Sequence, residues 1–282
     1  ETTGQENVFI GKKAGNCSVG NNCNTFIGNE TGRNFCRGSF NVAIGEASLY
    51  GGDDGAGTHM CESIFIGAKA GRPARQGNNS IFLGTYVGKN VSNTAYFNIA
   101  IGACAALGKT SGQTIGSNNI FVGRGSAKCL TSGSANAIIG GYSGWRLESG
   151  AYNAIIGYSA GNEVTTGDRN IFIGNEAGKC TSTGSGNIAL GCGTGSHWGA
   201  GDNYNLAIGF ASNNWIVGNS DYNVGIGTTN PNAAVTSGNT QKLSVGIVSA
   251  YQLYGDGSNL TGIADLYNGT SKKLETTANG IN

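Results

Sequence analysis

Short apolar triplets recur along the chain, and almost every one stands between an asparagine and a glycine. Their residues are mostly β-branched, aromatic or small, which suits short β-strands. The copies follow one another at 17 or 18 residues, apart from two intervals of 21 and 22. The closing glycines are Gly11, Gly28, Gly45, Gly67, Gly84, Gly102, Gly123, Gly140, Gly157, Gly174, Gly191, Gly209 and a degenerate copy at Gly227. This repeat predicts a β-solenoid in which each copy forms one coil.

Polar residues keep their own phase in the repeat. Asparagine stands four residues before the glycine in eleven of the thirteen copies, and Ser63 and Ser80 replace it in the other two. We expect a ladder of stacked asparagines, with glycines at the tight corners. Three apolar residues every 17 cannot sustain a helical stripe, and the glycines would destabilise helix interiors.

The apolar triplet has two faces because strand side chains alternate. The third position is always Ile, Leu or Val, so we expect the first and third positions to fill the inside of the coil. The middle position then points outward. An outward column of phenylalanines would be an interaction stripe, covered by copies of the same chain. The predicted interface residues are Phe9, Phe26, Phe65, Phe82, Phe121 and Phe172.

The repeat also sets the predicted domains. We expect an all-β chain with a parallel β-roll of about 13 coils over residues 1–218, followed by a small β connector over residues 219–282. Trp215 and Ile216 are placed to cover the open edge of the last coil near Gly218.

Composition narrows the function classes. The chain has 282 residues, of which 51 are glycine and 2 proline, and its net charge is +1 with 12 % charged residues. This balance lacks the basic footprint of nucleic-acid binding, and no apolar run is long enough to cross a membrane. The chain starts at Glu1, which indicates processing or a fragment of a longer protein. Eight cysteines without a CxxC pair argue against a zinc site and favour mostly free thiols.

The motif NxxIGxxAG resembles the left-handed β-roll heads of trimeric autotransporter adhesins. The segment NVGIGTTNPNAAVTSGNTQKLSVGIVSAYQLYGDGSNLTGI, residues 223–263, resembles tail-fibre proteins of marine bacteriophages, cyanophages in particular. The resemblance covers residues 7–218 for the roll and 219–282 for the connector. It implies a left-handed roll and a homotrimer around a threefold axis.

The resemblance also implies a function. We expect a structural and attachment segment of a viral tail fibre, located in the virion, that presents a multivalent binding surface to a host cell. Its partners would be copies of itself, other fibre or virion proteins, and a host surface glycan or protein. A bacterial trimeric surface adhesin is the alternative. A glycan-depolymerising tailspike would need paired carboxylates in a cleft, and the sequence shows none.

Catalytic motifs are absent from the sequence. The two histidines, His59 and His197, lack metal spacing with Cys, Asp or Glu. The segment GACAALGKT has one residue too many between its glycines for a phosphate-binding loop. We therefore expect no enzymatic activity, no cofactor and no metal.

The two long intervals are the remaining candidates for binding. They run through residues 49–62 and 107–118, and extra residues in a solenoid are expected to bulge onto its surface. The first contains the candidate receptor-loop residues Tyr50, Asp53, Asp54 and His59, which could stack on or hydrogen-bond a sugar. The alternative is a tolerated bulge on a shaft.

Overall fold

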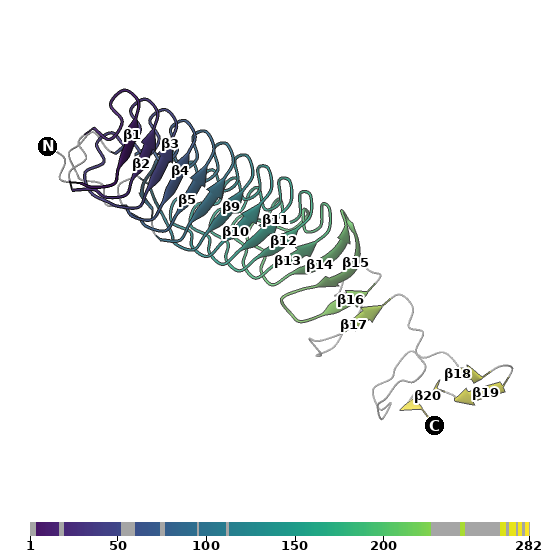
Figure 1. Ribbon diagram of the computed structural model, residues 1–282. Coiled ribbons are helices and arrows are strands. Elements are labelled where there is room, and N and C mark those ends of the chain that lie inside the picture. The colour runs from purple at the N-terminus through teal and green to yellow at the C-terminus, as the bar shows by residue number, and fades with distance from the viewer. Residues whose placement is uncertain are drawn as a thin grey trace. The chain divides into compact units, whose positions relative to one another are not determined.

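A computed structural model describes residues 4–16, 20–51, 60–73, 77–94, 96–110, 113–226, 243–245, 266–268, 271–274, 276–277 and 280–281. Its main feature is a row of short strands stacked in parallel in one sheet (Figure 1). These strands are β1 (Val8–Ile10), β2 (Thr25–Ile27), β3 (Val42–Ile44), β4 (Ile64–Ile66), β5 (Ile81–Leu83), β7 (Ile99–Ile101), β9 (Ile120–Val122), β10 (Ala137–Ile139), β11 (Ala154–Ile156), β12 (Ile171–Ile173), β13 (Ile188–Leu190) and β14 (Leu206–Phe210). The prediction of an all-β parallel solenoid with a repeat of about 17 residues is confirmed.

The solenoid has about 11 turns rather than the 13 coils expected. Parallel stacking ends at β14, because β15 (Asn213–Gly218) turns back and pairs antiparallel with it, Ile216 opposite Ile208. The degenerate thirteenth copy is β16 (Val224–Ile226), which pairs antiparallel with β15 and therefore does not continue the coil. Strand β15 thus pairs the edge of β14, while the side chain of Trp215 is exposed.

The chain divides into two compact units, Glu1–Gly246 and Ile247–Asn282. The first unit ends with β17 (Leu243–Val245), which pairs parallel with β16. In the second, β18 (Leu266–Asn268) pairs antiparallel with β19 (Ser271–Leu274), and β20 (Thr276–Thr277) with β21 (Gly280–Ile281). The predicted boundary after residue 218 follows the end of parallel stacking, whereas the compact units divide after Gly246.

The inside of the coil is filled by the middle residue of each strand. Phe26, Phe65, Phe82, Phe121 and Phe172 are fully buried within one chain. Neighbouring rings stack where two follow each other, with 5.1 Å between ring centroids for Phe65 and Phe82. Where the middle residue is alanine, as in β3, other side chains fill the core, among them Phe35, Leu49 and Met60.

The predicted orientation of the strands was therefore wrong. The middle residue lies two positions after the ladder asparagine, and residues two apart share one face of a strand. The ladder side chain is buried, so the middle side chain must point inward with it. A glycine four residues after the repeat glycine makes room for it: a Cβ on Gly178 would lie 2.5 Å from ring atoms of Phe172.

The asparagine ladder joins each coil to the next. The Oδ1 of Asn153 accepts hydrogen bonds from the backbone N–H of Asn170 at 2.9 Å and from its Nδ2 at 3.2 Å. The Nδ2 of Asn153 donates to the carbonyl of Gly167 at 2.9 Å. Ser63 and Ser80 still accept the N–H of the following coil, at 3.3 Å each, but donate within their own coil. The predicted ladder is thus present, including its two serine positions.

The repeat glycine closes the strand with a backbone that other residues rarely adopt. Gly140 has φ +136°, and a Cβ on it would lie 2.3 Å from the carbonyl oxygen of Gly157 in the next coil. Both the dihedral angle and the close approach of two backbones require glycine here.

The second insertion differs from the expected bulge. Residues Gln113–Ile115 form β8, which pairs in parallel with β6 (Val91–Thr94) of the preceding coil, and Ile115 is fully buried. Lys109, also within the insertion, forms an ion pair with Glu148 at 2.6 Å. Part of this segment therefore stays in the coil wall, because β6 offers it a ladder edge. The first insertion is described only at its ends, since residues 52–59 lie outside the described residues.

Candidate functional site

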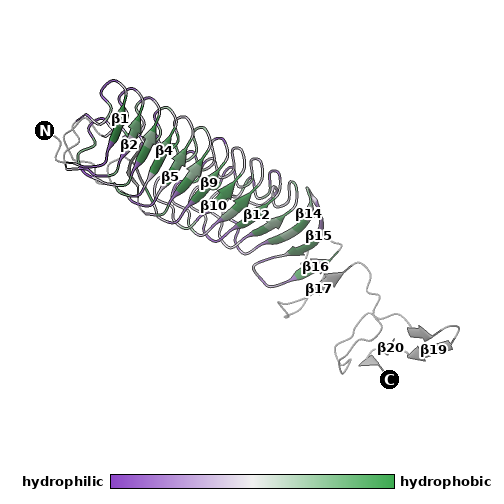
Figure 2. Cartoon of the chain, viewed as in Figure 1, coloured by the Kyte–Doolittle hydropathy of each residue, from purple (hydrophilic) through white to green (hydrophobic). Residues whose placement is uncertain are grey.

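The outer face of the parallel sheet is the largest candidate functional surface among the described residues. Its residues are the first and third residues of each strand, which form two continuous columns that are aliphatic except at Thr25. Figure 2 shows that apolar residues concentrate in these strands. Side chains exposed by 36 to 57 % in one chain are Val8, Ile10, Ile66, Ile101, Ile120, Ile139, Ile156, Ile171 and Ile173.

The size of this outer face sets it apart from ordinary surface apolar residues. Twelve strands about 4.8 Å apart give it a length of roughly 50 Å, and three residues per strand give it a width of roughly 10 Å. Single exposed aliphatic residues are normal on a protein surface, but a contiguous patch of this extent is typical of an interaction site. We call it the aliphatic face.

The predicted interface residues do not lie on this face. Phe26, Phe65, Phe82, Phe121 and Phe172 are inside the coil and fully buried, so a partner cannot reach them. Phe9, in the first strand, is partly buried and packs against the same core. The sequence did contain this information. In each copy the outer residues lie one and three positions after the ladder asparagine, so their side chains point to the opposite face of the strand.

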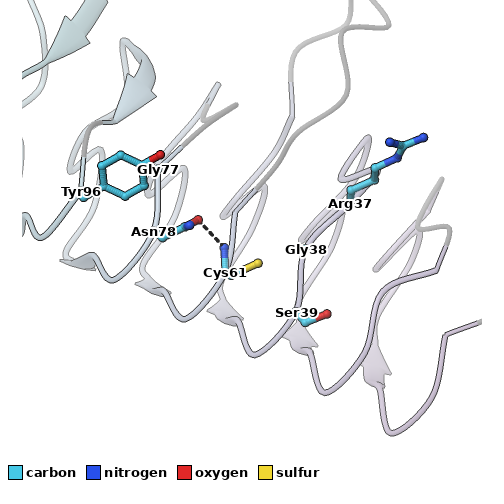
Figure 3. Close-up of a pocket in the computed structure, with 7 residues that line it drawn as sticks. All are labelled: Arg37, Gly38, Ser39, Cys61, Gly77, Asn78 and Tyr96. Carbon is cyan, nitrogen blue, oxygen red and sulfur yellow. Dashed lines mark hydrogen bonds between the residues drawn. The ribbon is translucent and has the colours of Figure 1, made fainter.

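The second feature is a pocket of about 390 Å³ at the corner before the strands. Its lining residues come from four successive coils and are Arg37, Gly38, Ser39, Cys61, Gly77, Asn78 and Tyr96. Figure 3 shows Arg37 and Tyr96 at opposite ends, with Asn78 and Cys61 between them. Its volume lies in the range of small-ligand sites, about 300–1,000 Å³.

Hydrogen bonds between coils hold the pocket floor. The backbone N–H of Cys61 donates to the Oδ1 of Asn78 at 2.9 Å (Figure 3). The Oγ of Ser39 accepts the N–H of Asn22 at 3.2 Å. Among the described residues that line the pocket there is no histidine, aspartate or glutamate. The guanidinium, amide, hydroxyl and ring suit binding of a polar ligand.

The candidate receptor-loop residues have different outcomes. Tyr50 is 4 % exposed, and the guanidinium carbons of Arg72 and Arg33 lie 4.4 Å and 5.5 Å from its ring centroid. A ring covered in this way cannot stack on a sugar, so the prediction for Tyr50 was wrong. Asp53, Asp54 and His59 lie outside the described residues.

The cysteines agree with the expected free thiols. Cys23, Cys61, Cys104, Cys129, Cys180 and Cys192 form no disulfide, and Cys17 lies outside the described residues. Burial raises the pKa of the Cys129 thiol. A hydrogen bond from Cys23 to the carboxylate of Glu6 raises the pKa of Cys23.

No group of three or more His, Cys, Asp or Glu side chains with metal-binding geometry occurs among the residues that the structure describes. In the same part of the chain, no helix has the length and apolar character needed to cross a membrane.

Comparison with known proteins adds no assignment. No protein-family model, curated protein or solved structure matches this chain. The aliphatic face, the corner pocket and the sequence resemblance are the features that bear on function.

Proposed function

We propose that the chain is a structural and attachment segment of a homotrimeric viral tail fibre, with a left-handed roll and no enzymatic activity or cofactor. The aliphatic face carries the proposal. One chain leaves this long apolar surface in water, and assembly would remove it from water at about 25 cal/mol per Å². The interface residues are then the first and third strand residues, in place of the buried phenylalanines.

The repeat favours copies of the same chain as the partner. Because the columns are uniform along the sheet, parallel copies in register place aliphatic rows against aliphatic rows over their whole length. A closed, symmetric oligomer buries the aliphatic face of every copy, whereas an open arrangement of copies would continue to add subunits. The number three comes from the resemblance to adhesin heads and tail fibres.

Attachment would follow from stiffness and repetition. Hydrogen bonds between successive coils make a straight rod that holds a binding surface away from its base. Three chains present each weak contact three times, and such linkage raises avidity by about 10²–10⁴. In this proposal the partners are other virion proteins at the ends of the rod and a glycan or protein on the host surface.

The oligomeric state tests the proposal directly. Light scattering after size exclusion should give three times the chain mass of 28.6 kDa. The double variant Ile139→Lys/Ile156→Lys, on neighbouring strands β10 and β11, should be monomeric but keep its β-sheet circular dichroism. It would place unpaired charges in the interface, where desolvation is unfavourable.

The matched control is Ser149→Lys, which adds the same side chain at an exposed corner and should leave the trimer intact. A monomeric wild-type protein, or a trimeric double-lysine variant, would contradict the assembly. Attachment is tested by sedimenting the labelled trimer with intact cells of a panel of bacterial strains, including marine cyanobacteria. Binding to none of them would contradict the attachment role.

A further inference from the structure

A row of exposed aromatic side chains lies along one corner of the solenoid. The residue just before each ladder position has a left-handed backbone in all twelve coils of the parallel stack, and in four of them it is aromatic. These residues are Phe40, Phe97, Tyr152 and Tyr204, with φ between +57° and +63°. Their side chains are exposed by 58 to 68 %. We call them the corner row.

The corner row is spaced regularly. Its members precede β3, β7, β11 and β14, which are the third, sixth, ninth and twelfth strands of the parallel stack (Figure 1). Because pairing keeps the same register from β3 to the start of β14, all four occupy one edge. Successive members are therefore about 14 Å apart at the strand spacing.

Stability of the single chain does not explain these residues. A bulky side chain in the left-handed region is unfavourable, whereas glycine and asparagine adopt it readily. The same column uses the favourable types at Asn79, Asn118 and Gly186, and it holds other non-aromatic residues with the same backbone at Glu6, Cys23, Glu62, Ala135 and Arg169. An exposed aromatic ring gains little from burial, so four such rings at one position of the repeat, each three coils from the next, point to a role in binding.

The residues between the aromatic rings keep this column polar. Glu62 and Asn79 lie between Phe40 and Phe97, and the Nδ2 of Asn79 donates to Glu62 at 2.5 Å. Arg169 follows Tyr152, with its guanidinium carbon 5.6 Å from the ring centroid. Burying these charged groups in a dry subunit interface would be unfavourable, which separates the corner row from the aliphatic face.

A ligand for this surface must alternate apolar faces and hydrogen-bonding groups along a line. A linear polysaccharide has this chemistry: sugar rings stack on aromatic side chains through their C–H faces, and their hydroxyls bond to amides, carboxylates and guanidinium groups. Each sugar of an extended polysaccharide advances by about the spacing of two successive coils. Every third sugar would therefore meet an aromatic side chain of the corner row.

We propose that the corner row is a binding track for a linear glycan, in which four aromatic rings each stack on one sugar of every three. The pocket lined by Ser39, Asn78 and Tyr96 lies between Phe40 and Phe97 and supplies hydrogen bonds in the first interval. This inference deepens the proposed attachment function and rests on it. Each contact is weak, and the repeat along one chain provides the affinity.

Asparagine substitutions test the track because Asn79 and Asn118 already occupy this column with the same backbone. We would measure binding by isothermal titration to linear β-1,4-, β-1,3- and α-1,4-linked glucan oligosaccharides of three and twelve units, and to purified lipopolysaccharide O-chains. At least one probe should bind the wild-type protein. Twelve units should bind at least about tenfold more tightly than three.

The variants should weaken binding in proportion to the rings removed. Phe97→Asn or Tyr152→Asn alone should lower affinity about two- to tenfold, and the quadruple Phe40→Asn/Phe97→Asn/Tyr152→Asn/Tyr204→Asn variant about 10²-fold or more. Tyr158→Asn is the matched control, since Tyr158 is 55 % exposed but lies after its strand, at another corner. It should bind like the wild type.

The spacing is tested by removing one coil. Deletion of residues 119–135 takes out one 17-residue repeat between Phe97 and Tyr152 and rejoins Asn118 to Asn136 in register. It shortens this interval from three coils to two, and should weaken the twelve-unit probe by at least about fivefold while leaving the three-unit probe unchanged. If the deletion variant bound the twelve-unit probe as tightly as the wild type does, the proposed three-coil period would be overturned.

Other outcomes separate this inference from the proposed function. If no probe binds the wild-type protein, or the quadruple variant binds as well as the wild type, the glycan track is overturned while the trimer can stand. If the quadruple variant becomes monomeric, the corner row is a subunit contact and the track is again overturned. A monomeric wild-type protein that still binds through the row would instead contradict the trimer alone.

Discussion

The inner and outer faces of the same strands differ in what covers them, although both are apolar. Phe121 in the middle of β9 is fully buried, whereas Ile120 beside it is 41 % exposed. The inner residue changes between Phe, Ala and Ile from coil to coil, because other core side chains compensate for its volume. The outer columns stay mostly β-branched and are aliphatic apart from Thr25. The single chain covers its own inner face, whereas in the proposed assembly copies of the chain cover the outer one.

Two adjacent glycines at one corner of the coil differ most in whether they tolerate substitution. In Gly140→Ala, a Cβ would approach the Gly157 carbonyl to 2.3 Å with φ at +136°, so we expect loss of the folded solenoid. The adjacent Gly141→Ala is the control, because its nearest neighbour would be Tyr158 at an ordinary 3.4 Å.

Thermal unfolding followed by circular dichroism measures both variants. Gly141→Ala should fold and match the wild type or gain about 0.4–1 kcal/mol, since alanine restricts the unfolded chain. A folded Gly140→Ala variant with unchanged melting temperature would mean that the coils do not approach as closely as described.

Neighbouring residues of β9 test the two faces themselves. Phe121→Ala should lower the free energy of unfolding by about 3–5 kcal/mol, because it leaves a cavity inside the coil. Val122→Ala removes methyl groups from the aliphatic face, so its effect should fall on oligomer dissociation, with a larger dependence of unfolding on protein concentration.

Urea unfolding at several protein concentrations separates the two effects. The comparison between faces fails if Phe121→Ala unfolds like the wild type, or if Val122→Ala destabilises a dilute, dissociated chain as much as Phe121→Ala does.

Substitutions in the asparagine ladder should have an effect of intermediate size on the unfolding free energy. The two serine positions of the ladder suggest a graded test. Asn153→Ala leaves the N–H of Asn170 and the carbonyl of Gly167 without their partners, so we expect a loss of about 2–4 kcal/mol in unfolding free energy. Asn153→Ser keeps an acceptor for that N–H, as Ser80 does for Asn98, and should lose roughly half as much. Equal losses in chemical denaturation would show that the cross-coil carbonyl contact alone carries the ladder.

Much of the fold could be predicted from the sequence because spacing alone defines it. The interval of the repeat glycines gave the coil, and the phase of asparagine gave the ladder that Asn153 and its neighbours form. The inward direction of the Phe121 side chain was not predicted, because the residues on both faces of the triplet are apolar. The decisive information was the buried asparagine two residues earlier, which points to the same side. The pairing of Gln113–Ile115 with β6 depends on an edge that no local pattern reveals.

The candidate site was less accessible to sequence reasoning. The insertions were the predicted binding segments, yet Tyr50 at the start of the first one is covered by Arg33 and Arg72. The corner row was readable as an aromatic residue before the ladder position in every third coil of the parallel stack, but its significance depends on exposure, as at Tyr152. Exposure is a property of the folded coil.

Two thiols at one position of the repeat give the smallest expected effect. Cys129 and Cys180 both lie six residues after their repeat glycine, yet Cys129 is partly buried and Cys180 is exposed. Burial raises the pKa of Cys129, so at a given pH less of it is the reactive thiolate. We expect iodoacetamide at pH 8 to alkylate Cys180 several-fold faster, as measured by peptide mass spectrometry, and the rate at Cys129 to continue rising at higher pH. Both should react at similar rates in concentrated urea, where burial is lost. A faster Cys129 in the folded protein would mean that the corner around it is open, and that the faces of the coil are less distinct than their exposures indicate.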